Sequence, residues 1–382
     1  MRFIPYGHQS IDDKDIQSVV EVLKSDWLTT GPTVDLFERE LASYAGARHA
    51  VAVNSGTSAL DIAVQALALP EGSGIITTPF TFAATSNAIL YNGHVPVFAD
   101  IDPTTRNIHP DEIKKRITPK TRAIIYVDYA GHPCAIDEIR EIAREHDLRL
   151  IEDACHALGA SYKGRKIGTF ADMTVFSFHP VKPITTGEGG AVATDDPALN
   201  AQLRLLRSHG ITRDVGGMFG EGASWGYDMQ LLGRNYRMTD IQAALGVSQL
   251  RKIDSFIKRR NELAALYTRA LSDLAWLDLP RTQEHVTHGW HLYTVLLKGI
   301  ERNTLFSYLK ERGIGANVHY IPTYKFSYYR RYYPQNTNAF PSTEDVFNRI
   351  LTLPLYPGMK DEDVKYVSER LHEAEFDLQI SV

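Results

Sequence analysis

The stretch HAVAVNSGTSALDIAVQALA, residues 49–68, carries the pattern that decides the fold. Its first part is a short run rich in valine and alanine, which is typical of a buried β-strand, and its second part has apolar residues at helical spacing. The turn residues Asn54, Ser55 and Gly56 stand between the two parts. The stretch therefore predicts one strand followed directly by one helix, which is the repeating unit of a parallel sheet.

The same alternation of strand and helix continues to about residue 195. Further strand-like runs occupy 74–78, 95–99, 123–128, 149–153, 173–178 and 190–194. Helix-like stretches occupy 56–68, 83–91, 111–116, 135–146 and 197–208. Strands that alternate with helices at this spacing indicate an α/β fold with a mostly parallel sheet covered on both faces. Because ligands of such sheets bind at the carboxyl ends of the strands, we expect the functional site there.

The pattern changes in the last third of the chain. It predicts a helix at 239–271, a strand at 291–297, a helix at 304–312, a strand at 316–320, a tyrosine-rich loop at 324–334 and a closing helix at 361–373. We therefore expect a large domain over residues 1–254 and a smaller α+β domain over residues 255–382.

Composition and charge exclude several classes of protein. The 382 residues carry 41 basic and 46 acidic side chains, and the net charge of −5 does not favour a dedicated nucleic-acid binder. Two cysteines are too few for a disulfide-stabilised secreted domain or a cysteine-rich zinc module. Apolar runs of about five residues are far shorter than the ~18 that a membrane helix needs, and the start MRFIPYGHQS lacks the apolar core of a signal peptide. We expect a cytoplasmic enzyme that binds neither nucleic acid nor membrane.

The segment Asn54-Ser55-Gly56-Thr57-Ser58 follows the first predicted strand and opens a helix. Backbone N–H groups at a helix start, small residues that allow close approach and hydroxyl donors together form a phosphate cradle. An ordinary serine N-cap is the alternative interpretation of the same residues.

Two carboxylates end another predicted strand in IEDACH, residues 151–156. Asp153 is expected at the carboxyl edge of the sheet, where a carboxylate can bind a cation or hold a protonated heterocyclic nitrogen. A helix N-cap aspartate fits the same pattern. His156 is either a contact of the bound ring or a polar residue that caps the next turn.

Lys182 ends the segment SFHPVK, residues 177–182, which lies between two predicted strands among apolar residues and glycines. A partly desolvated lysine has a lowered pKa and can form a Schiff base with a carbonyl compound. The alternative is a solvated loop lysine, which is what most lysines are.

Two other kinds of site find less support. His285, His288 and His291 recur at every third residue and run into a predicted strand, where residues three apart point to opposite faces, so we expect no metal site. The strand–helix alternation alone would also suit a nicotinamide-dependent oxidoreductase, but the GxGxxG fingerprint does not occur.

Five segments occur in an order that resembles the DegT/DnrJ/EryC1/StrS family of pyridoxal-phosphate sugar aminotransferases. They are NSGTSAL (54–60), TPFTF (78–82), EDACHALGA (152–160), SFHPVKPITTGEGGA (177–191) and NYRMTDIQAA (235–244). The resemblance extends from DWLTTGP (26–32) to LPLYPGM (353–359). It implies a PLP-dependent transferase fold of type I, like that of aspartate aminotransferase, and a homodimer with active sites at its interface.

The resemblance also implies roles for individual residues around pyridoxal 5′-phosphate. Lys182 matches the lysine that forms the Schiff base, Asp153 would pair with the pyridinium nitrogen, and Phe82 would stack on the ring. His156 stands where many members carry glutamine and would also contact the cofactor. The phosphate would be held by Ser55, Gly56, Thr57 and Ser177, with Asn235 reaching it from the other subunit.

Within the family, the segments 4–16, 25–32 and 177–186 look most like the enzymes of the pseudaminic acid pathway. That likeness implies L-glutamate as amino donor and C4 of a UDP-linked 4-keto-6-deoxy-N-acetylhexosamine as acceptor. Aminotransferases of the bacillosamine, perosamine and aminoarabinose types share most of these motifs and are the alternatives. The related 3-dehydratases carry histidine in place of Lys182, so dehydration is disfavoured. The residues that match substrate-contacting regions are Tyr6, Leu28, Thr29, Thr30, His319 and Tyr320.

Overall fold

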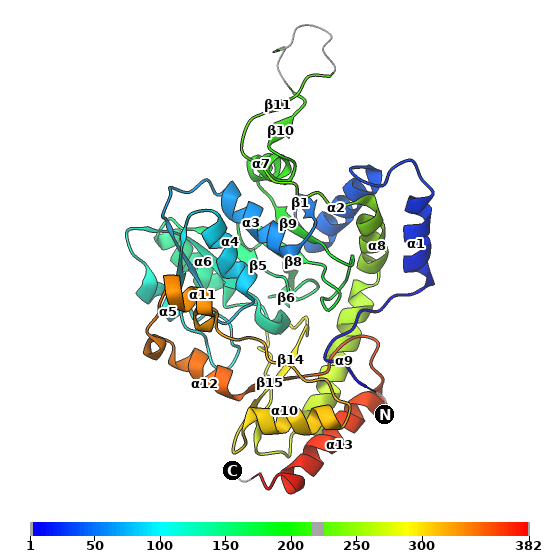
Figure 1. Cartoon of the computed structure of the whole chain (residues 1–382), viewed down its shortest axis with the longest axis vertical. Coiled ribbons are helices and arrows are strands. Elements are labelled where there is room, and N and C mark those ends of the chain that lie inside the picture. Colours follow the sequence, from blue (N-terminus) through cyan, green and yellow to red (C-terminus); the bar gives the residue numbers. More distant parts are fainter. Residues whose placement is uncertain (1–2, 215–217, 219–224, 381–382) are drawn as a thin grey trace.

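The computed structural model describes residues 3–214, 218 and 225–380 (Figure 1). At its centre lies a seven-stranded sheet in the order β1-β9-β8-β5-β4-β2-β3. The strands are β1 (His49–Val53), β2 (Gly74–Thr77), β3 (Val95–Phe98), β4 (Thr121–Val127), β5 (Arg149–Asp153), β8 (Met173–Ser177) and β9 (Gly190–Thr194). Each overlaps a predicted run, because each is a short apolar segment bounded by turn residues.

Parallel pairing dominates this sheet. The pairs β3–β2, β2–β4, β4–β5 and β5–β8 are parallel, whereas β9 is antiparallel to both β8 and β1. The carboxyl ends of the parallel strands therefore meet at one edge, where Asp153 ends β5 and Ser177 ends β8. The predicted α/β class with a mostly parallel sheet is confirmed.

Helices cover both faces of the sheet. One face is covered by α2 (Pro32–Ala45), α5 (Pro110–Arg116), α6 (Ile136–Glu145) and α8 (Asp240–Leu250), and the other by α3 (Gly56–Ala66), α4 (Ala83–Tyr91) and α7 (Pro197–Arg207). Successive strand residues point to opposite faces, so Ile124 packs in the first of these cores and Ile125 in the second. Helix α1 (Asp13–Leu23) lies against α8.

The C-terminal third builds a separate core around Tyr267, Trp276 and Leu371, which Ile4 joins from the start of the chain. An antiparallel sheet of β12 (Leu277–Asp278), β14 (Tyr293–Leu297) and β15 (Ile350–Leu353) packs there with α9 (Ile253–Ala270), α10 (Arg302–Glu311) and α13 (Asp361–Asp377). The predicted domain boundary between residues 254 and 255 stays a prediction, and it falls inside α9.

Several short elements complete the fold. They are the sheet β13 (Val286–Thr287), β6 (Ser161–Tyr162) and β7 (Arg165–Lys166), the helices α11 (Ser327–Tyr332) and α12 (Pro341–Arg349), and the single turns η1 (Tyr129–Gly131), η2 (Thr323–Lys325) and η3 (Thr337–Ala339). The strands β10 (Ile211–Thr212) and β11 (Asp228–Met229) pair in an arm that projects from the body of the molecule (Figure 1).

The prediction of one helix over 239–271 is wrong. Arg251 and Lys252 separate α8 from α9. Each helix follows a different core, since Val247 of α8 packs against the seven-stranded sheet and Tyr267 of α9 packs in the C-terminal core. Helical periodicity continues through the break, so the pattern of apolar residues alone does not reveal it.

The prediction of a strand at 316–320 is also wrong. One isolated bridge forms there, between Asn317 and Thr352, and the N–H of Val318 donates to the side-chain oxygen of Asn317 at 2.8 Å. A side chain that bonds its neighbouring backbone competes with a strand ladder, which explains the irregular segment. The tyrosine-rich stretch 324–334 contains the helix α11 as well as loop.

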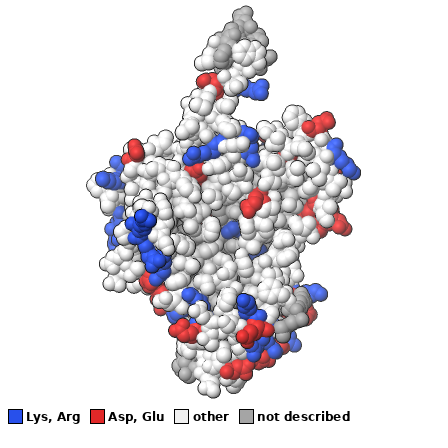
Figure 2. Space-filling view, in the orientation of Figure 1, with Lys and Arg blue, Asp and Glu red and all other residues white. Residues whose placement is uncertain are grey.

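On the face shown in Figure 2, acidic and basic side chains occur in small groups of both signs. Among the helices in the described part of the chain, none combines the length and the apolar character that a transmembrane segment requires.

Candidate active site

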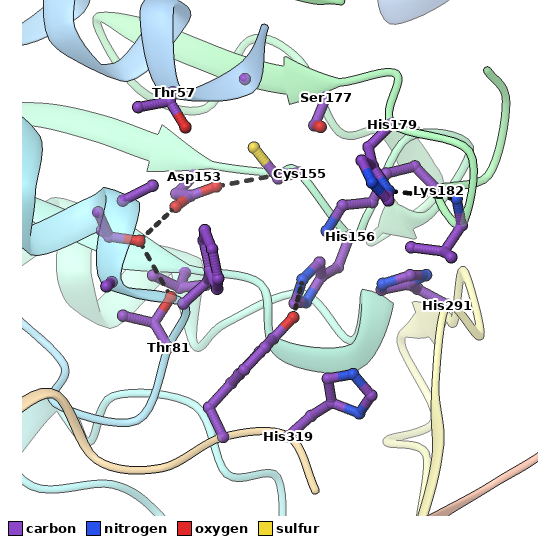
Figure 3. A pocket seen from close by; sticks show the side chains of 18 of the residues that line it. Thr57, Thr81, Asp153, Cys155, His156, Ser177, His179, Lys182, His291 and His319 are labelled. Carbon is purple, nitrogen blue, oxygen red and sulfur yellow. Dashed lines mark hydrogen bonds between the residues drawn. The ribbon is translucent and has the colours of Figure 1, made fainter. Parts of the chain in front are cut away.

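A cavity of about 570 Å³ lies at the carboxyl edge of the parallel strands (Figure 3). The loops after β1, β2, β5 and β8 line one side, and the segment 317–321 lies across from them. Eleven of the fifteen predicted site residues line this cavity: Tyr6, Ser55, Gly56, Thr57, Phe82, Asp153, His156, Ser177, Lys182, His319 and Tyr320. These residues come from segments far apart in the sequence, and the sheet topology brings them together.

The start of α3 forms one wall of the cavity. Ser55 is the N-cap of this helix, and its Oγ accepts a hydrogen bond from the N–H of Ser58 at 3.0 Å. Among the described residues, the N–H groups of Gly56 and Thr57 and the hydroxyl of Ser177 have no partner. A Cβ on residue 56 would lie 2.8 Å from the Cβ of Ser177, so glycine lets the two segments approach. The helix is capped by Ser55 and still offers free donors to an anion.

Asp153 lies at the end of β5 and is buried. Its Oδ2 accepts a hydrogen bond from the hydroxyl of Thr85 at 2.8 Å, and its Oδ1 accepts one from the N–H of Cys155 at 3.2 Å. The hydroxyls of Thr85 and Thr81 are 3.0 Å apart, and this second hydrogen bond orients the Thr85 hydroxyl toward Asp153. Hydrogen bonds to both oxygens hold the carboxyl group in one orientation at the cavity wall.

Lys182 reaches the cavity from the segment between β8 and β9 (Figure 3). Its backbone N–H donates to the carbonyl of His179 at 2.8 Å, which shapes the turn that carries it. Burial lowers the pKa of the Lys182 ammonium, and the nearby Cys155 and Asp153 oppose this shift only in part. A lowered pKa increases the fraction of neutral amine, which is the nucleophilic and proton-accepting form.

Two histidines lie on the side of the cavity away from α3. His156 is buried, and burial together with the charge of Lys182 holds its pKa well below the usual range. Its Nε2 lies 3.0 Å from the hydroxyl of Tyr320. His319 also has a lowered pKa, about 3, chiefly through burial, and its Nδ1 bonds the hydroxyl of Thr352 at 2.9 Å. Both imidazoles are therefore neutral at physiological pH.

Aromatic rings frame the mouth of the cavity. Phe82 is 60% exposed, so its ring is free to cover a planar ligand, and it lies 6.2 Å from the ring of Tyr320. The ring of Tyr6 lies 5.2 Å from that of His319. The predicted stacking of Phe82 on a bound ring stays a prediction, with an exposed aromatic face in its support.

The four remaining predicted residues lie outside this cavity: Leu28, Thr29, Thr30 and Asn235. The carbonyl of Leu28 accepts a hydrogen bond from the N–H of Asp240 at 3.0 Å, and Thr29 forms a bridge with Thr239. Asn235 is exposed. Within a single chain, these four residues do not line the cavity.

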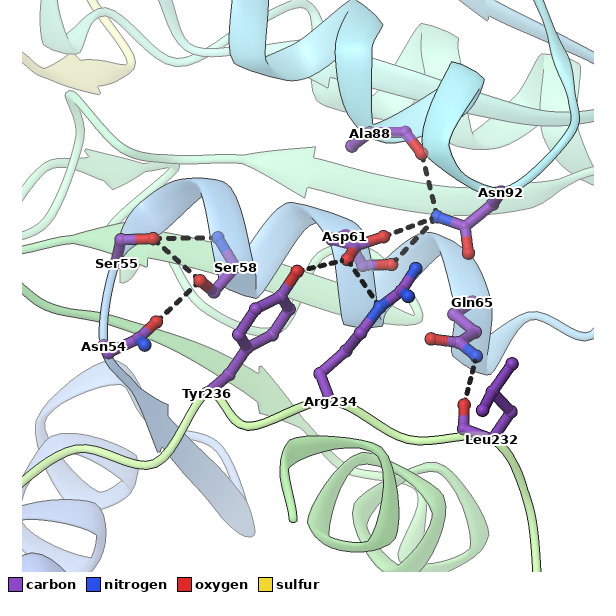
Figure 4. A network of polar contacts seen from close by, with 10 residues as sticks. All are labelled: Asn54, Ser55, Ser58, Asp61, Gln65, Ala88, Asn92, Leu232, Arg234 and Tyr236. Carbon is purple, nitrogen blue, oxygen red and sulfur yellow. Dashed lines mark hydrogen bonds and ion pairs between the residues drawn. The ribbon is translucent and has the colours of Figure 1, made fainter. Parts of the chain in front are cut away.

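The segment that carries Asn235 is tied to the outer side of α3 (Figure 4). Asp61 of α3 accepts hydrogen bonds from Arg234 at 3.2 Å and from the hydroxyl of Tyr236 at 2.8 Å, and Gln65 bonds the carbonyl of Leu232 at 2.9 Å. Since the residues on both sides of Asn235 bond to α3, its own side chain is free to face another molecule.

The structure adds residues that the sequence analysis did not single out. Thr81 lies in the quoted segment TPFTF and Thr85 follows one helical turn later, so a polar pair at i and i+4 was the available signal. His291 lines the cavity with its ring 4.5 Å from that of His156, whereas His288 stacks on Trp290 at 3.9 Å. The three histidines of the 285–291 run do not converge, and no group of three potential metal ligands occurs among the described residues.

The chemistry of this donor set fits a phosphorylated pyridine aldehyde. Free N–H and hydroxyl donors at the start of α3 suit a phosphate, and the buried carboxylate of Asp153 suits a protonated ring nitrogen. The amine of Lys182 suits an aldehyde carbon. Gly56 leaves space for close approach at the phosphate end, because a Cβ there would collide with Ser177.

Comparisons with known proteins support the same chemistry. The sequence model of the DegT/DnrJ/EryC1/StrS aminotransferase family matches residues 9–372. The spore coat polysaccharide biosynthesis protein SpsC of Bacillus subtilis is 40% identical over 97% of both chains. The UDP-4-amino-4,6-dideoxy-N-acetyl-beta-L-altrosamine transaminase of Campylobacter jejuni is 39% identical over 96% of both chains.

A solved structure shares the whole architecture. PseC of Helicobacter pylori, an aminotransferase involved in the biosynthesis of pseudoaminic acid, superimposes with a TM-score of 0.92 at 34% identity. The alignment covers 97% of this chain and 99% of that one. The similarity therefore includes both the seven-stranded sheet and the C-terminal core.

Proposed function

The chain belongs to the DegT/DnrJ/EryC1/StrS aminotransferase family, and on that premise we propose that it transfers the amino group of L-glutamate to C4 of a UDP-linked 4-keto-6-deoxy-N-acetylhexosamine. The enzyme class follows from the family and its relatives, which are PLP-dependent nucleotide-sugar aminotransferases. Two likenesses support the finer substrate: the Campylobacter transaminase at 39% identity and the Helicobacter structure. Because the family model matches almost the whole chain, the alternative of a nicotinamide-dependent oxidoreductase is rejected.

The observation that carries this function is the placement of Lys182 and Asp153 in one cavity with the free donors of α3. Bound PLP supplies an electron sink for the carbon next to the transferred amino group. The start of α3 would hold the phosphate, and the Asp153 carboxylate would keep the ring nitrogen protonated. As a neutral amine, Lys182 Nζ would take the proton from the amino-bearing carbon of glutamate and would later donate one proton to the sugar carbon that receives the amino group.

A different keto sugar is the second candidate substrate. The Bacillus protein SpsC, named for spore coat polysaccharide biosynthesis, is as similar to this chain as the Campylobacter transaminase, with 40% against 39% identity. A nucleotide-linked keto sugar of the bacillosamine, perosamine or aminoarabinose type would use the same cavity and the same Lys182.

The proposal includes a homodimer whose sites are completed across its interface. Asn235, Leu28, Thr29 and Thr30 lie outside the cavity of their own chain. Large apolar side chains of the projecting arm and of the 27–28 segment are exposed: Trp27, Leu28, Trp225, Tyr227, Met229 and Leu232. Exposed apolar surface of this kind is typical of a protein interface.

A product assay tests the substrate. The purified enzyme would be incubated with L-glutamate and a panel of UDP- and dTDP-linked 3-keto and 4-keto sugars, and the aminated products would be identified by mass and NMR. We expect the fastest turnover with the UDP-linked 4-keto-6-deoxy-N-acetylhexosamine, and we expect the product to carry its new amino group at C4. Fast turnover of another sugar and none of this one would reject the proposed substrate and retain the enzyme class.

A further inference from the structure

The hydroxyl of Tyr320 points into the cavity next to His156. The only polar partner that this hydroxyl has among the described residues is Nε2 of His156, 3.0 Å away. The contact has two possible directions: either the phenol donates to an unprotonated Nε2, or a protonated Nε2 donates to the phenol oxygen. The direction decides whether Tyr320 still has a proton to offer to a ligand.

The backbone around His156 determines that direction. The N–H of Ala130 donates to Nδ1 of His156 at 3.2 Å, so Nδ1 is an acceptor and carries no proton. Burial and the charge of Lys182 keep the pKa of His156 low, so the ring is neutral and has one N–H group. That proton is therefore on Nε2, and Nε2–H donates to the oxygen of Tyr320.

Hydrogen bonds to the surrounding backbone hold Ala130 in place. Ala130 and Trp290 both have left-handed backbone conformations, with φ values of 58° and 45°. The N–H of His291 donates to the carbonyl of Ala130 at 2.9 Å, and the buried Arg260 donates to the carbonyl of Trp290 at 2.9 Å. Non-glycine residues adopt such conformations where surrounding contacts compensate the cost, so the orientation of the Ala130 N–H is well determined.

The phenol of Tyr320 thus accepts from His156 and keeps its own proton. Burial raises the pKa of Tyr320 well above its ordinary value, so the hydroxyl stays protonated across the physiological range. Among the described residues nothing accepts this proton, although the side chain lines the cavity. The half-buried hydroxyl therefore presents a free proton at the cavity wall, where an oxygen of a bound ligand can accept it.

We propose that the hydroxyl of Tyr320, oriented by His156, donates a hydrogen bond to the ketone oxygen of the sugar at the carbon that receives the amino group. Such a bond polarises the carbonyl for attack by an amine and favours a ketone over a sugar that lacks this oxygen. The proposal rests on the nucleotide-sugar aminotransferase class and is independent of which sugar and which carbon are used.

The first test is the position of the proton on His156. In the holoenzyme labelled with 15N-histidine, the ring signals of His156 would be identified by their loss in His156→Gln. We expect the pattern of a neutral ring protonated at Nε2. Protonation at Nδ1 would mean that the Tyr320 proton is bound to Nε2, and this result overturns the proposal whatever the substrate.

The second test separates the ketone from the rest of the sugar nucleotide. The probes are the keto sugar that wild-type enzyme aminates fastest in the panel above and the same nucleotide sugar without oxygen at the aminated carbon. Their dissociation constants would be measured by calorimetry on the enzyme without added amino donor. Loss of one neutral hydrogen bond corresponds to roughly 2- to 13-fold in affinity, so we expect the wild type to prefer the ketone by that factor.

Tyr320→Phe removes only the hydroxyl and should erase this preference while binding the deoxygenated probe normally. The matched control is Tyr308→Phe, because the Tyr308 hydroxyl bonds Asp377 at 2.8 Å outside the cavity. An unchanged preference in Tyr320→Phe overturns the proposal. If that unchanged preference is accompanied by a shifted cofactor absorbance, the hydroxyl donates to an oxygen of the cofactor instead of the sugar.

Discussion

At the scale of single residues, the neighbouring carboxylates Glu152 and Asp153 of β5 lie in different environments, because successive strand residues face opposite sides of the sheet. Asp153 faces the cavity and accepts two hydrogen bonds. Glu152 is fully buried on the other side, where its Oε2 accepts one bond from Thr174 at 2.8 Å and its Oε1 has no hydrogen-bond partner among the described residues. Burial raises the pKa of Glu152 to about 7 and also raises that of the adjacent Asp128.

Glu152 should make the stability of the protein depend on pH. Its pKa is higher in the folded state than in the unfolded chain, so its contribution is complete below the unfolded pKa of about 4.3 and is lost as pH rises toward 7 and above. Glu152→Gln keeps an acceptor for Thr174 without the titration. We expect the variant to gain stability relative to wild type between pH 5 and pH 8, by about 1–3 kcal/mol at pH 8.

Denaturant unfolding across this pH range measures the difference. The matched control is Glu145→Gln, an exposed glutamate at the end of α6, which should follow the wild-type curve. Parallel curves for wild type and Glu152→Gln would show that another group carries the pH dependence.

Lys182 should be the residue that binds the cofactor covalently. Borohydride reduction of the purified enzyme is expected to leave the cofactor mass on the peptide that contains Lys182. Lys182→Ala loses the amine that moves the proton and should slow the half-reaction with glutamate by at least about 10²–10⁴-fold, while the cofactor still binds. Lys120→Ala, on an exposed loop, is the control. An adduct on another lysine would disprove the assignment.

At the scale of elements, α3 links two functions along one helix. Its start faces the cavity with free N–H groups. Further along the helix, Asp61 and Gln65 hold the segment that carries Asn235 (Figure 4). The helix is tightly packed, since all but two of its eleven residues are buried. The close contact between Gly56 and Ser177 sets how near an anion can approach its first turn.

Gly56→Ala should weaken cofactor binding more than folding. The added methyl group would lie 2.8 Å from Cβ and 3.0 Å from Oγ of Ser177, in the space where both segments meet the cavity. We expect the cofactor affinity to fall by about 10- to 100-fold, since one or two charge-assisted hydrogen bonds are displaced. Absorbance titration of the apoenzyme measures this affinity, and thermal unfolding reports on stability.

Gly74→Ala is the matched control for this substitution. A methyl group there would meet no atom closer than 3.5 Å, and the residue lies in β2 outside the cavity. Equal losses of cofactor affinity in the two variants would count against a phosphate site at the start of α3.

At the scale of the whole molecule, the projecting arm (Figure 1) and the exposed 27–30 segment support the proposed dimer. A single chain holds most of the site, but Asn235 and the three residues of the 28–30 segment lie on its outer surface. The same elements carry large exposed apolar side chains, which the proposed interface would bury.

Complementation tests whether sites are shared between subunits. Lys182→Ala and Asn235→Ala would be prepared as separate homodimers and mixed under conditions where subunits exchange. If Asn235 donates to the phosphate in the neighbouring subunit, one of the two sites in each heterodimer regains both native residues. Activity at limiting cofactor should then exceed the sum of the parents, because Asn235→Ala alone costs about 1.5–3 kcal/mol of phosphate binding.

Differently tagged subunits would verify the exchange. If exchange is complete and the activity stays at the sum of the parents, Asn235 does not act in the neighbouring subunit. It then acts in its own subunit or has no role in the site.

Local sequence was enough to predict much of the fold and, with the family resemblance, to indicate the candidate site. The seven strands and the strand–turn–helix unit around Gly56 follow from segments of five to fifteen residues. The same segments left an ordinary alternative open for Asp153 and for Lys182, and only the family resemblance implied their roles. Backbone preference and side-chain alternation act over that range, so such segments carry their own structural information. The family resemblance uses the same short segments, in their order along the chain.

The tertiary structure alone decided the rest. The break between α8 and α9 depends on two separate cores. Thr85 contacts Asp153, and Ala130 determines the proton position on His156, through contacts that join residues far apart in the sequence. Such contacts depend on how elements pack in space, and periodicity within one element contains no information about its distant neighbours.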